Sequence, residues 1–208
     1  MTKVDETREQ IKEAASTLFQ HYGYEKTSMD DIAKACHKAK GSIYYHFASK
    51  EDLYSVIVDD EIEKLKRILL AVLTNQDETA PVRFAHYIYA KLEFCNQSYN
   101  YRQALKIDFL SQSGLIGHNK LIQEAIAGLE KWEREQLVTL VITGKNNGHI
   151  SDNIDATAFV EIVFMILKSL EVQFYVKNKY ESYSPAFNSL LVNVVQALSS
   201  NVINFDLK

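Results

Sequence analysis

The sequence predicts an all-α protein of about nine helices, and three observations favour this class. Apolar residues recur every three or four positions along most of the 208 residues, which is the spacing of one helix face. No alternating apolar and polar run of any length indicates a strand. Only 7 glycines and 2 prolines interrupt the chain, and these are the residues that most strongly end helices.

Four helices are expected in the first third of the chain, over residues 5–22, 29–36, 39–46 and 49–73. Gly23 can take the left-handed conformation that ends the first of them. Ser28 and Asp31 form a capping-box variant ahead of the second helix. Ser49 and Asp52 repeat this spacing ahead of the fourth helix, which the sequence therefore predicts to begin near residue 49.

The later helices are expected after a break at residues 75–81, where Pro81 suits the first turn of a helix. One apolar stripe runs from Phe84 to Tyr99. Further stripes cover 105–110, 121–141, 155–177 and 184–201. The segment Gly144–Gly148 is expected to stop the longest of these, and no internal repeat is visible.

Composition argues against several classes of protein. The apolar and charged fractions, 47% and 24%, are typical of a soluble globular protein. The longest wholly apolar runs, 68–73 and 162–167, fall far short of the roughly 20 residues that span a bilayer. No signal-peptide core is visible near the N-terminus, so we expect a cytoplasmic protein without membrane partners. Cys36 and Cys95 are too few for a disulfide framework or a zinc site, and no cofactor is expected.

The candidate functional segment consists of the two short helices at 29–36 and 39–46. Two short helices joined by a tight turn form a helix-turn-helix, which places its second helix in the major groove of DNA. Only Ile43 and Phe47 of that second helix look buried. The residues left on or near its outer face are Lys40, Gly41, Ser42, Tyr44, Tyr45 and His46. Adjacent tyrosines with a histidine suit phosphates and thymine methyl groups better than a merely solvated face.

Charge is unevenly distributed along the chain. Residues 26–50 hold five lysines and two aspartates, a net charge of +3. Residues 51–208 hold 15 basic and 20 acidic residues, a net charge of −5. A basic segment on an acidic chain orients the molecule towards a polyanion, so the overall charge of −4 does not argue against nucleic acid.

Two runs, Thr27–Lys34 and Lys40–Leu53, resemble the DNA-binding head of TetR-type transcriptional regulators, and the resemblance extends over about residues 8–57. It implies a DNA-binding domain over 1–50 and a helical ligand-binding and dimerisation domain over 51–208. The implied phosphate contacts come from Ser28, Tyr44, His46 and Lys50, and the implied base-edge contacts from Lys40, Gly41, Ser42 and Tyr45. The implied partners are a double-stranded DNA operator, a second copy of the chain and a small-molecule effector.

The turn between the two short helices departs from that family's pattern. His37 stands where a glycine is usual, Lys38 where an apolar residue is usual, and Ala39 where a serine usually caps the next helix. Histidine tolerates the left-handed conformation better than most residues, so we expect the turn to form. The missing cap is expected to cost about 1 kcal/mol.

The last two expected helices are apolar on more than one face, so they need a partner besides their own core. A four-helix bundle between two copies would supply it. The residues expected at this interface are Phe159, Val163, Ile166, Leu170, Phe174, Leu191, Val194, Val195 and Leu198. Such a dimer would place two heads about one DNA turn apart and predicts a near-palindromic operator. A buried hairpin in a monomer is the alternative.

The middle helices are rich in aromatic residues. One interpretation is an apolar ligand pocket with a few polar anchors, lined by Tyr87, Phe94, Tyr99, Arg102, Phe109, Trp132 and Lys168. The alternative is that each of these residues belongs simply to the core or the surface. Arg102 and Lys168 would suit an acidic ligand.

The sequence as a whole predicts a homodimeric DNA-binding repressor that a small molecule releases by coupling the body to the heads. The helix over 49–73 is the expected link between the two parts. A protein–protein adaptor of the same fold is the alternative, and the irregular turn at 37–39 is the feature that favours it. An enzyme is disfavoured because no nucleophile, base or metal cluster is visible.

Overall fold

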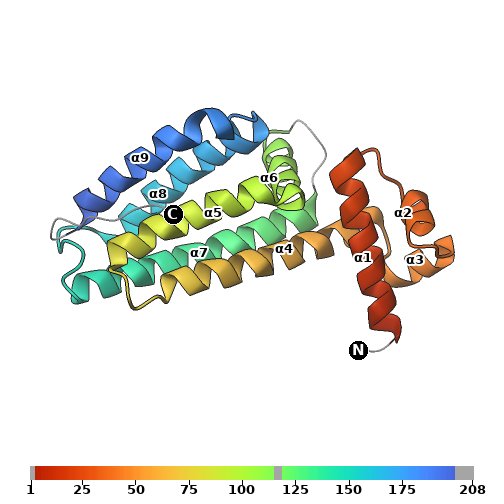
Figure 1. The fold of residues 1–208 in the computed structure, drawn as a ribbon, viewed down its shortest axis with the longest axis horizontal. Coiled ribbons are helices and arrows are strands. Elements are labelled where there is room, and N and C mark those ends of the chain that lie inside the picture. Colours follow the sequence, from red (N-terminus) through yellow and green to blue (C-terminus); the bar gives the residue numbers. More distant parts are fainter. Residues whose placement is uncertain (1–2, 115–118, 200–208) are drawn as a thin grey trace. The chain divides into compact units, whose positions relative to one another are not determined.

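In the computed structural model, which describes residues 3–114 and 119–199, helix follows helix along the chain (Figure 1). The elements are α1 (Lys3–Tyr22), α2 (Met29–Ala35), α3 (Lys40–His46), α4 (Lys50–Leu73), α5 (Ala80–Gln97), α6 (Tyr99–Gln112), α7 (Lys120–Asn146), α8 (Ala156–Glu171), the π-helical turn η1 (Val172–Val176) and α9 (Tyr180–Leu198). Over these described ranges the nine α-helices confirm the predicted all-α class. None of them combines the length and apolarity that a membrane span requires.

Three helix boundaries differ from the expected ones for local reasons. The extended backbone of Ser98, with φ −84° and ψ 106°, ends α5, so Tyr99 begins α6 instead of continuing the α5 stripe. The helix expected over 155–177 changes after Glu171 into η1, where the N–H of Lys177 bonds to the carbonyl of Val172. The last helix begins at Tyr180, four residues early, with Pro185 inside it. Its expected end at residue 201 lies outside the described residues.

The chain divides into two compact units. The first unit contains Met1–Ile62 and Tyr99–Ala125, and the second contains Glu63–Ser98 and Ile126–Lys208. Helices α4 and α7 each contribute residues to both. The first unit therefore holds α6 as well as the three N-terminal helices. The functional division expected at residue 50 stays a prediction.

Aromatic contacts and two side-chain hydrogen bonds hold α1, α4 and α6 together within the first unit. The buried rings of Phe19 and Tyr54 meet edge to face with centroids 5.3 Å apart, and Tyr24 lies 4.7 Å from Tyr54. The Tyr54 hydroxyl donates to the carbonyl of Asn100 at 2.9 Å. The Asn100 side-chain amide donates to Ser16 Oγ at 2.7 Å. The start of α6 is therefore tied by hydrogen bonds to both α1 and α4.

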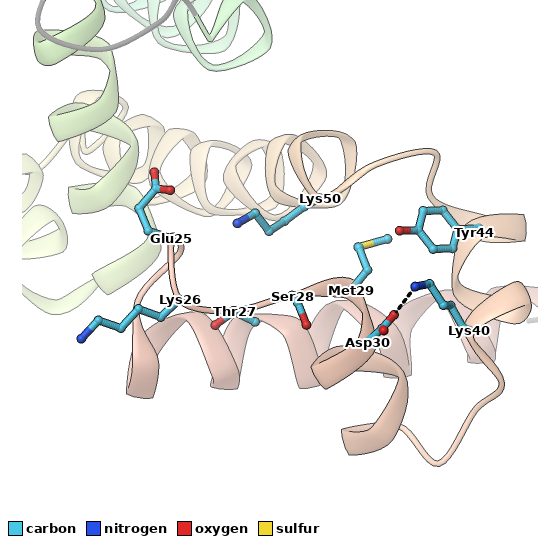
Figure 2. Close-up of a pocket in the computed structure, with 9 residues that line it drawn as sticks. All are labelled: Glu25, Lys26, Thr27, Ser28, Met29, Asp30, Lys40, Tyr44 and Lys50. Carbon is cyan, nitrogen blue, oxygen red and sulfur yellow. Dashed lines mark ion pairs between the residues drawn. The ribbon is translucent and has the colours of Figure 1, made fainter.

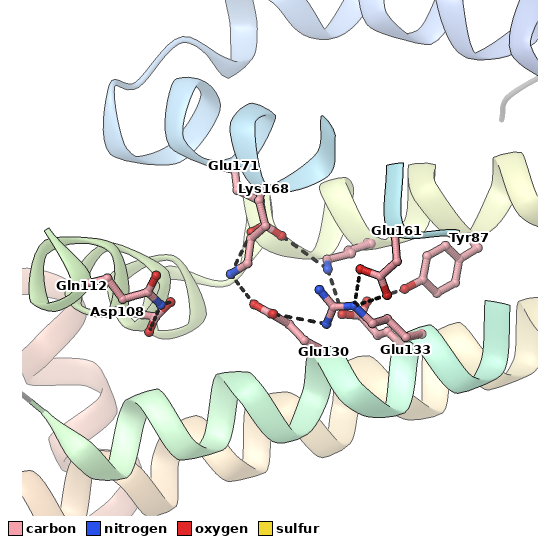
Figure 3. Close-up of polar contacts among 10 residues, drawn as sticks. Tyr87, Asp108, Gln112, Glu130, Glu133, Glu161, Lys168 and Glu171 are labelled. Atoms are coloured by element: carbon pink, nitrogen blue, oxygen red, sulfur yellow. Dashed lines mark hydrogen bonds and ion pairs between the residues drawn. The ribbon is translucent and has the colours of Figure 1, made fainter. Parts of the chain in front are cut away.

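A buried ionic network joins α5, α7 and α8 within the second unit (Figure 3). Lys91 pairs with Glu133 at 2.8 Å and with Glu171 at 3.4 Å, and the Tyr87 hydroxyl also donates to Glu133. All four side chains are buried. Burial alone would lower the pKa of Lys91, but the charges of Glu133 and Glu171 outweigh it and hold the pKa above its ordinary value. Lys91 is therefore a charged residue of the core.

Removing one charge of this network is expected to destabilise the protein strongly. Glu133→Gln keeps the shape of the side chain but leaves Lys91 without its closer anion, and breaking a buried pair in this way costs about 3–5 kcal/mol. The control is Glu161→Gln, which removes a half-exposed carboxylate 3.1 Å from Arg134 and should cost less than about 1 kcal/mol. Urea unfolding at fixed protein concentration measures both. Equal losses for the two variants would contradict the role assigned to the network.

Candidate nucleic-acid interface

The turn between α2 and α3 closes with a regular set of hydrogen bonds. His37 has a positive φ of 54°, the left-handed conformation in which glycine is usual. The N–H of Lys38 donates to the carbonyl of Ala33 at 3.0 Å, and the N–H of His37 donates to the carbonyl of Lys34 at 3.1 Å. This pattern is a Schellman motif, which satisfies the last carbonyls of a helix. The prediction that the turn forms despite His37 is confirmed.

The two helices begin differently. A capping box opens α2, as predicted: Ser28 Oγ accepts the N–H of Asp31, and the Asp31 carboxylate accepts the N–H of Ser28 at 3.0 Å. The Ser28 hydroxyl also donates to that carboxylate at 2.6 Å and, with the backbone bond, lowers the pKa of Asp31. Ala39 provides no side-chain cap for α3, again as predicted. Helix α3, which carries the expected base contacts, therefore has a less stable first turn than α2.

Helix α3 turns one narrow face inward. Ile43 and Phe47 are 0% and 1% exposed, whereas Tyr45 is 77% and Tyr44 is 45% exposed. Lys40 and Gly41 are exposed as well, and Ser42 and His46 lie half-buried at the sides. The residues expected on the outer face of α3 are therefore exposed or half-buried in the structure. Contacts of these residues with DNA stay a prediction.

An arginine of α1, which no pattern in the sequence indicates, fixes the end of α3. Arg8 Nη1 donates to the carbonyl of His46 at 2.9 Å, and the guanidinium lies 4.3 Å from the centroid of the Phe47 ring. A cation is favourable at a helix C-terminus because the last carbonyls lack partners there. Arg8 therefore sets the position of α3 without being part of its exposed face.

A shallow pocket of about 400 Å³ opens beside α2 and α3 within the first unit (Figure 2). Its lining comprises Glu25, Lys26, Thr27, Ser28, Met29, Asp30, Lys40, Tyr44 and Lys50. Four of the eight residues predicted to contact DNA are among them: Ser28, Lys40, Tyr44 and Lys50. The lining contains three lysines and two acidic residues, so it carries a net positive charge.

Two lysines of this pocket are held by neighbours within the same unit. Lys40 Nζ lies 2.7 Å from Asp30 Oδ1, and this hydrogen bond raises the pKa of Lys40 (Figure 2). Lys50 Nζ donates to the carbonyl of Tyr24 at 3.0 Å and lies 4.3 Å from the centroid of its ring. Asp30 and Tyr24 were not among the predicted site residues. No spacing in the sequence indicates either contact.

The residues predicted to line a ligand pocket are divided between the two units. Tyr99, Arg102 and Phe109 belong to the first unit, whereas Tyr87, Phe94, Trp132 and Lys168 belong to the second. Within the second unit, Lys168 pairs with Glu130 and lies 3.8 Å from Glu171, at the edge of the buried ionic network. Among residues 3–114 and 119–199, no group of three or more His, Cys, Asp or Glu side chains could hold a metal ion.

Most residues predicted at the dimer interface lie in the interior of the second unit. Val163, Phe174, Leu191, Val195 and Leu198 are buried, Phe159, Leu170 and Val194 are half-buried, and Ile166 is exposed. A side chain buried within one chain has almost no area to offer a second copy, so we assign the five buried residues to the core. The most exposed large apolar side chains of α8 and α9, between 53% and 70%, are Ile162, Met165, Ile166 and Leu190.

Restoring the missing cap is expected to stabilise the interface. Ala39→Ser supplies an oxygen that can accept the N–H of Gly41 in the first turn of α3 and should raise the free energy of unfolding by about 1 kcal/mol. Ala39→Val, which adds bulk without an acceptor, is the control. Chemical unfolding followed by circular dichroism measures both. If Ala39→Ser were no more stable than Ala39→Val, α3 would not be limited by its start.

Comparison with known proteins identifies the N-terminal segment. Residues 11–57 match the family described as bacterial regulatory proteins, tetR family. Over 72 residues, 35% of this chain, 40% are identical to the biofilm operon icaADBC HTH-type negative transcriptional regulator IcaR of Staphylococcus aureus. Over 56 residues, 38% are identical to the A-factor receptor protein of Streptomyces griseus. These matches span 37% and 20% of the two relatives, so they concern only a part of each protein.

Solved structures extend the likeness in fold to nearly the whole chain. A TetR transcriptional regulator from Chloroflexus aurantiacus superposes with a TM-score of 0.75 at 23% identity, covering 96% of this chain and 99% of that one. A protein from Saccharomonospora viridis in complex with choline gives a TM-score of 0.74 at 18% identity, covering 97% and 100%. Residues 11–57 therefore match the tetR family of bacterial regulatory proteins, and the chain shares the fold of these solved structures.

Proposed function

We propose that this protein is a DNA-binding transcriptional repressor that acts in the cytoplasm as a homodimer. The single observation that carries the proposal is the exposed face of α3, where Tyr44, Tyr45 and Lys40 stand clear of the buried Ile43 and Phe47. A short helix with such a face suits the major groove, where tyrosine and lysine can reach phosphates and base edges. Repression is supported by the relative IcaR, which is named a negative transcriptional regulator.

Gly41 adds independent support. A Cβ atom built at this position would meet nothing within 4 Å, and the backbone is not in the left-handed region. The fold itself therefore does not require glycine here, although glycine costs a helix about 1 kcal/mol relative to alanine. The absence of a side chain on the exposed side of α3 suits close approach of a groove floor.

Phosphate contacts fit the pocket beside α3. Ser28, Tyr44 and Lys50 line it, and half-buried His46 follows on the same helix as Tyr44. Hydroxyl groups and ammonium groups are the usual partners of phosphate oxygens, which position a protein on DNA without reading its sequence. We assign these four residues to that role.

The irregular turn at 37–39 no longer favours the alternative hypothesis of a protein–protein adaptor. The turn at His37 closes with both hydrogen bonds of a Schellman motif, so its unusual sequence does not disrupt the helix-turn-helix. No second feature of the described residues supports that alternative.

Dimerisation is proposed through the exposed apolar side chains of α8 and α9, namely Ile162, Met165, Ile166 and Leu190. Exposed apolar side chains of this kind are favourably covered by the same side chains of a second copy related by a two-fold axis. Two heads related by that axis would read two half-sites in opposite orientations. We therefore propose a near-palindromic operator.

Release by a small molecule is proposed to act through α6 and α4. The hydrogen bonds of Asn100 with Tyr54 and Ser16 tie α6 to the helices that support α3. A ligand that binds better when α6 is displaced would lower operator affinity, and the operator would weaken ligand binding by the same factor. The neighbouring fold from Saccharomonospora viridis, solved with choline, supports a small molecule as the effector class.

Salt dependence and two substitutions in the head test the DNA contacts. Operator affinity should fall steeply with rising salt, because each neutralised phosphate releases about 0.9 of a counterion. Lys50→Ala should weaken binding to all duplexes alike and reduce the salt slope by about 0.9 per head. Tyr45→Ala should instead narrow the difference between the operator and a scrambled duplex. Fluorescence anisotropy over a salt series measures all three.

The control for this series is Lys106→Ala, which removes an exposed lysine of α6 and should leave affinity and slope unchanged. Affinity of the unaltered protein that does not depend on salt would contradict binding to phosphates. Equal effects of Tyr45→Ala on operator and scrambled DNA would contradict base reading by α3.

The proposed dimer surface can be tested by a substitution within it. Ile166→Glu places a charge among its exposed apolar side chains and should weaken the dimer about 100-fold, or about 3 kcal/mol, because that charge would be desolvated without a partner. Sedimentation equilibrium measures the dissociation constant. The control is Ile142→Glu, which alters an apolar residue of α7 that is 48% exposed and lies outside the proposed surface. A dimer equally sensitive to both changes, or insensitive to Ile166→Glu, would place the interface elsewhere.

A further inference from the structure

A carboxylate lies on the surface that is proposed to face DNA. Asp30 of α2 is half-exposed, lines the pocket beside α3 and has no role in the capping box, which Ser28 and Asp31 form. A negative charge at this position repels a polyanion. Its presence therefore calls for a function that offsets this cost.

The partner of Asp30 is a lysine expected to read bases. Asp30 Oδ1 lies 2.7 Å from Lys40 Nζ, and the ammonium group also lies 5.9 Å from the centroid of the Tyr44 ring (Figure 2). The pair connects α2 to the first residue of α3, which has no side-chain cap. Because the side chains of Lys40 and Asp30 are 59% and 51% exposed, water screens the pair and it exchanges partners readily.

The other charged groups of the pocket leave Lys40 as the partner of Asp30. Lys50 is held by the carbonyl and ring of Tyr24 on the opposite side. Lys26 and Glu25 complete the charged lining; Glu25 is itself an anion, and Lys26 has no ion pair with Asp30 in the described structure. The carboxylate thus acts chiefly on the one lysine that begins α3.

We propose that Asp30 is a specificity-determining residue that competes with DNA phosphates for Lys40; the inference rests on the proposed function. On unrelated DNA, a phosphate that approaches Lys40 also approaches the Asp30 carboxylate, and the two anions repel each other. Lys40 therefore gains the phosphate only by giving up Asp30, and the exchange yields little. On the operator, Lys40 has three N–H donors and can bond to a base-edge acceptor such as guanine O6 while it keeps Asp30. Asp30 therefore weakens binding to unrelated DNA more than binding to the operator.

A double-mutant cycle tests the competition. Asp30→Asn, Lys40→Ala and the double variant are titrated against a duplex selected from a random library and against its scrambled form, over a salt series. In the presence of Lys40, Asp30→Asn should tighten binding to scrambled DNA about fivefold near 0.15 M salt and steepen its salt slope by about 0.9 per head. Operator affinity should change less, so the specificity ratio should fall. In the Lys40→Ala background, Asp30→Asn removes only the direct repulsion, so it should change affinity and slope less than it does when Lys40 is present.

The controls separate competition from simple charge effects. Glu13→Gln removes the same charge from the exposed face of α1 and should leave the specificity ratio unchanged. If Asp30→Asn had equal effects with and without Lys40, Asp30 would merely repel DNA and the inference would be overturned. An unchanged specificity ratio would also overturn it. If no sequence were enriched from the library, the proposed function itself would fail, and the inference would fall with it.

Discussion

The burial of Ile43 and Phe47 beneath α3 is the constraint on which the proposed DNA interface depends. A seven-residue helix has too few hydrogen bonds to be stable alone, so packing decides its orientation. The two buried side chains are four residues apart and occupy one narrow face, which leaves Tyr44 and Tyr45 pointing away from the core. Arg8 completes the arrangement by holding the last carbonyl of α3 and covering the Phe47 ring.

Local features of this fold could be predicted because their causes are local. Helical spacing located the elements, the Ser28–Asp31 box marked the start of α2, and His37 was compatible with the left-handed turn. Contacts between helices were missed, because the partners of Arg8 and Lys40 follow from tertiary geometry and not from spacing. The break at Ser98 was missed as well, since neither glycine nor proline marks it.

The residues predicted at the dimer interface show a second limit to what apolar periodicity in the sequence can predict. An apolar stripe identifies a face that avoids water, but it does not tell a face covered by the chain's own core from one left for a partner. Val163 and Ile166 stand in the same predicted set, yet the first is buried and the second is 53% exposed. Lys91 and Glu133 illustrate the converse, since polar residues became core because each satisfies the other's charge. The second unit thus keeps the Lys91–Glu133 pair out of water, whereas the Lys40–Asp30 pair of the first unit is exposed and can exchange.

The outer face of α3 is proposed to read the major groove, and replacement of single groups in the operator tests this most directly. Substituting 7-deazaguanine for guanine, or uracil for thymine, removes major-groove groups, whereas inosine for guanine removes only a minor-groove amino group. We predict that major-groove replacements within the half-sites cost up to about 1–3 kcal/mol of binding free energy, and that inosine costs little. Loss of affinity with inosine alone would contradict the claim.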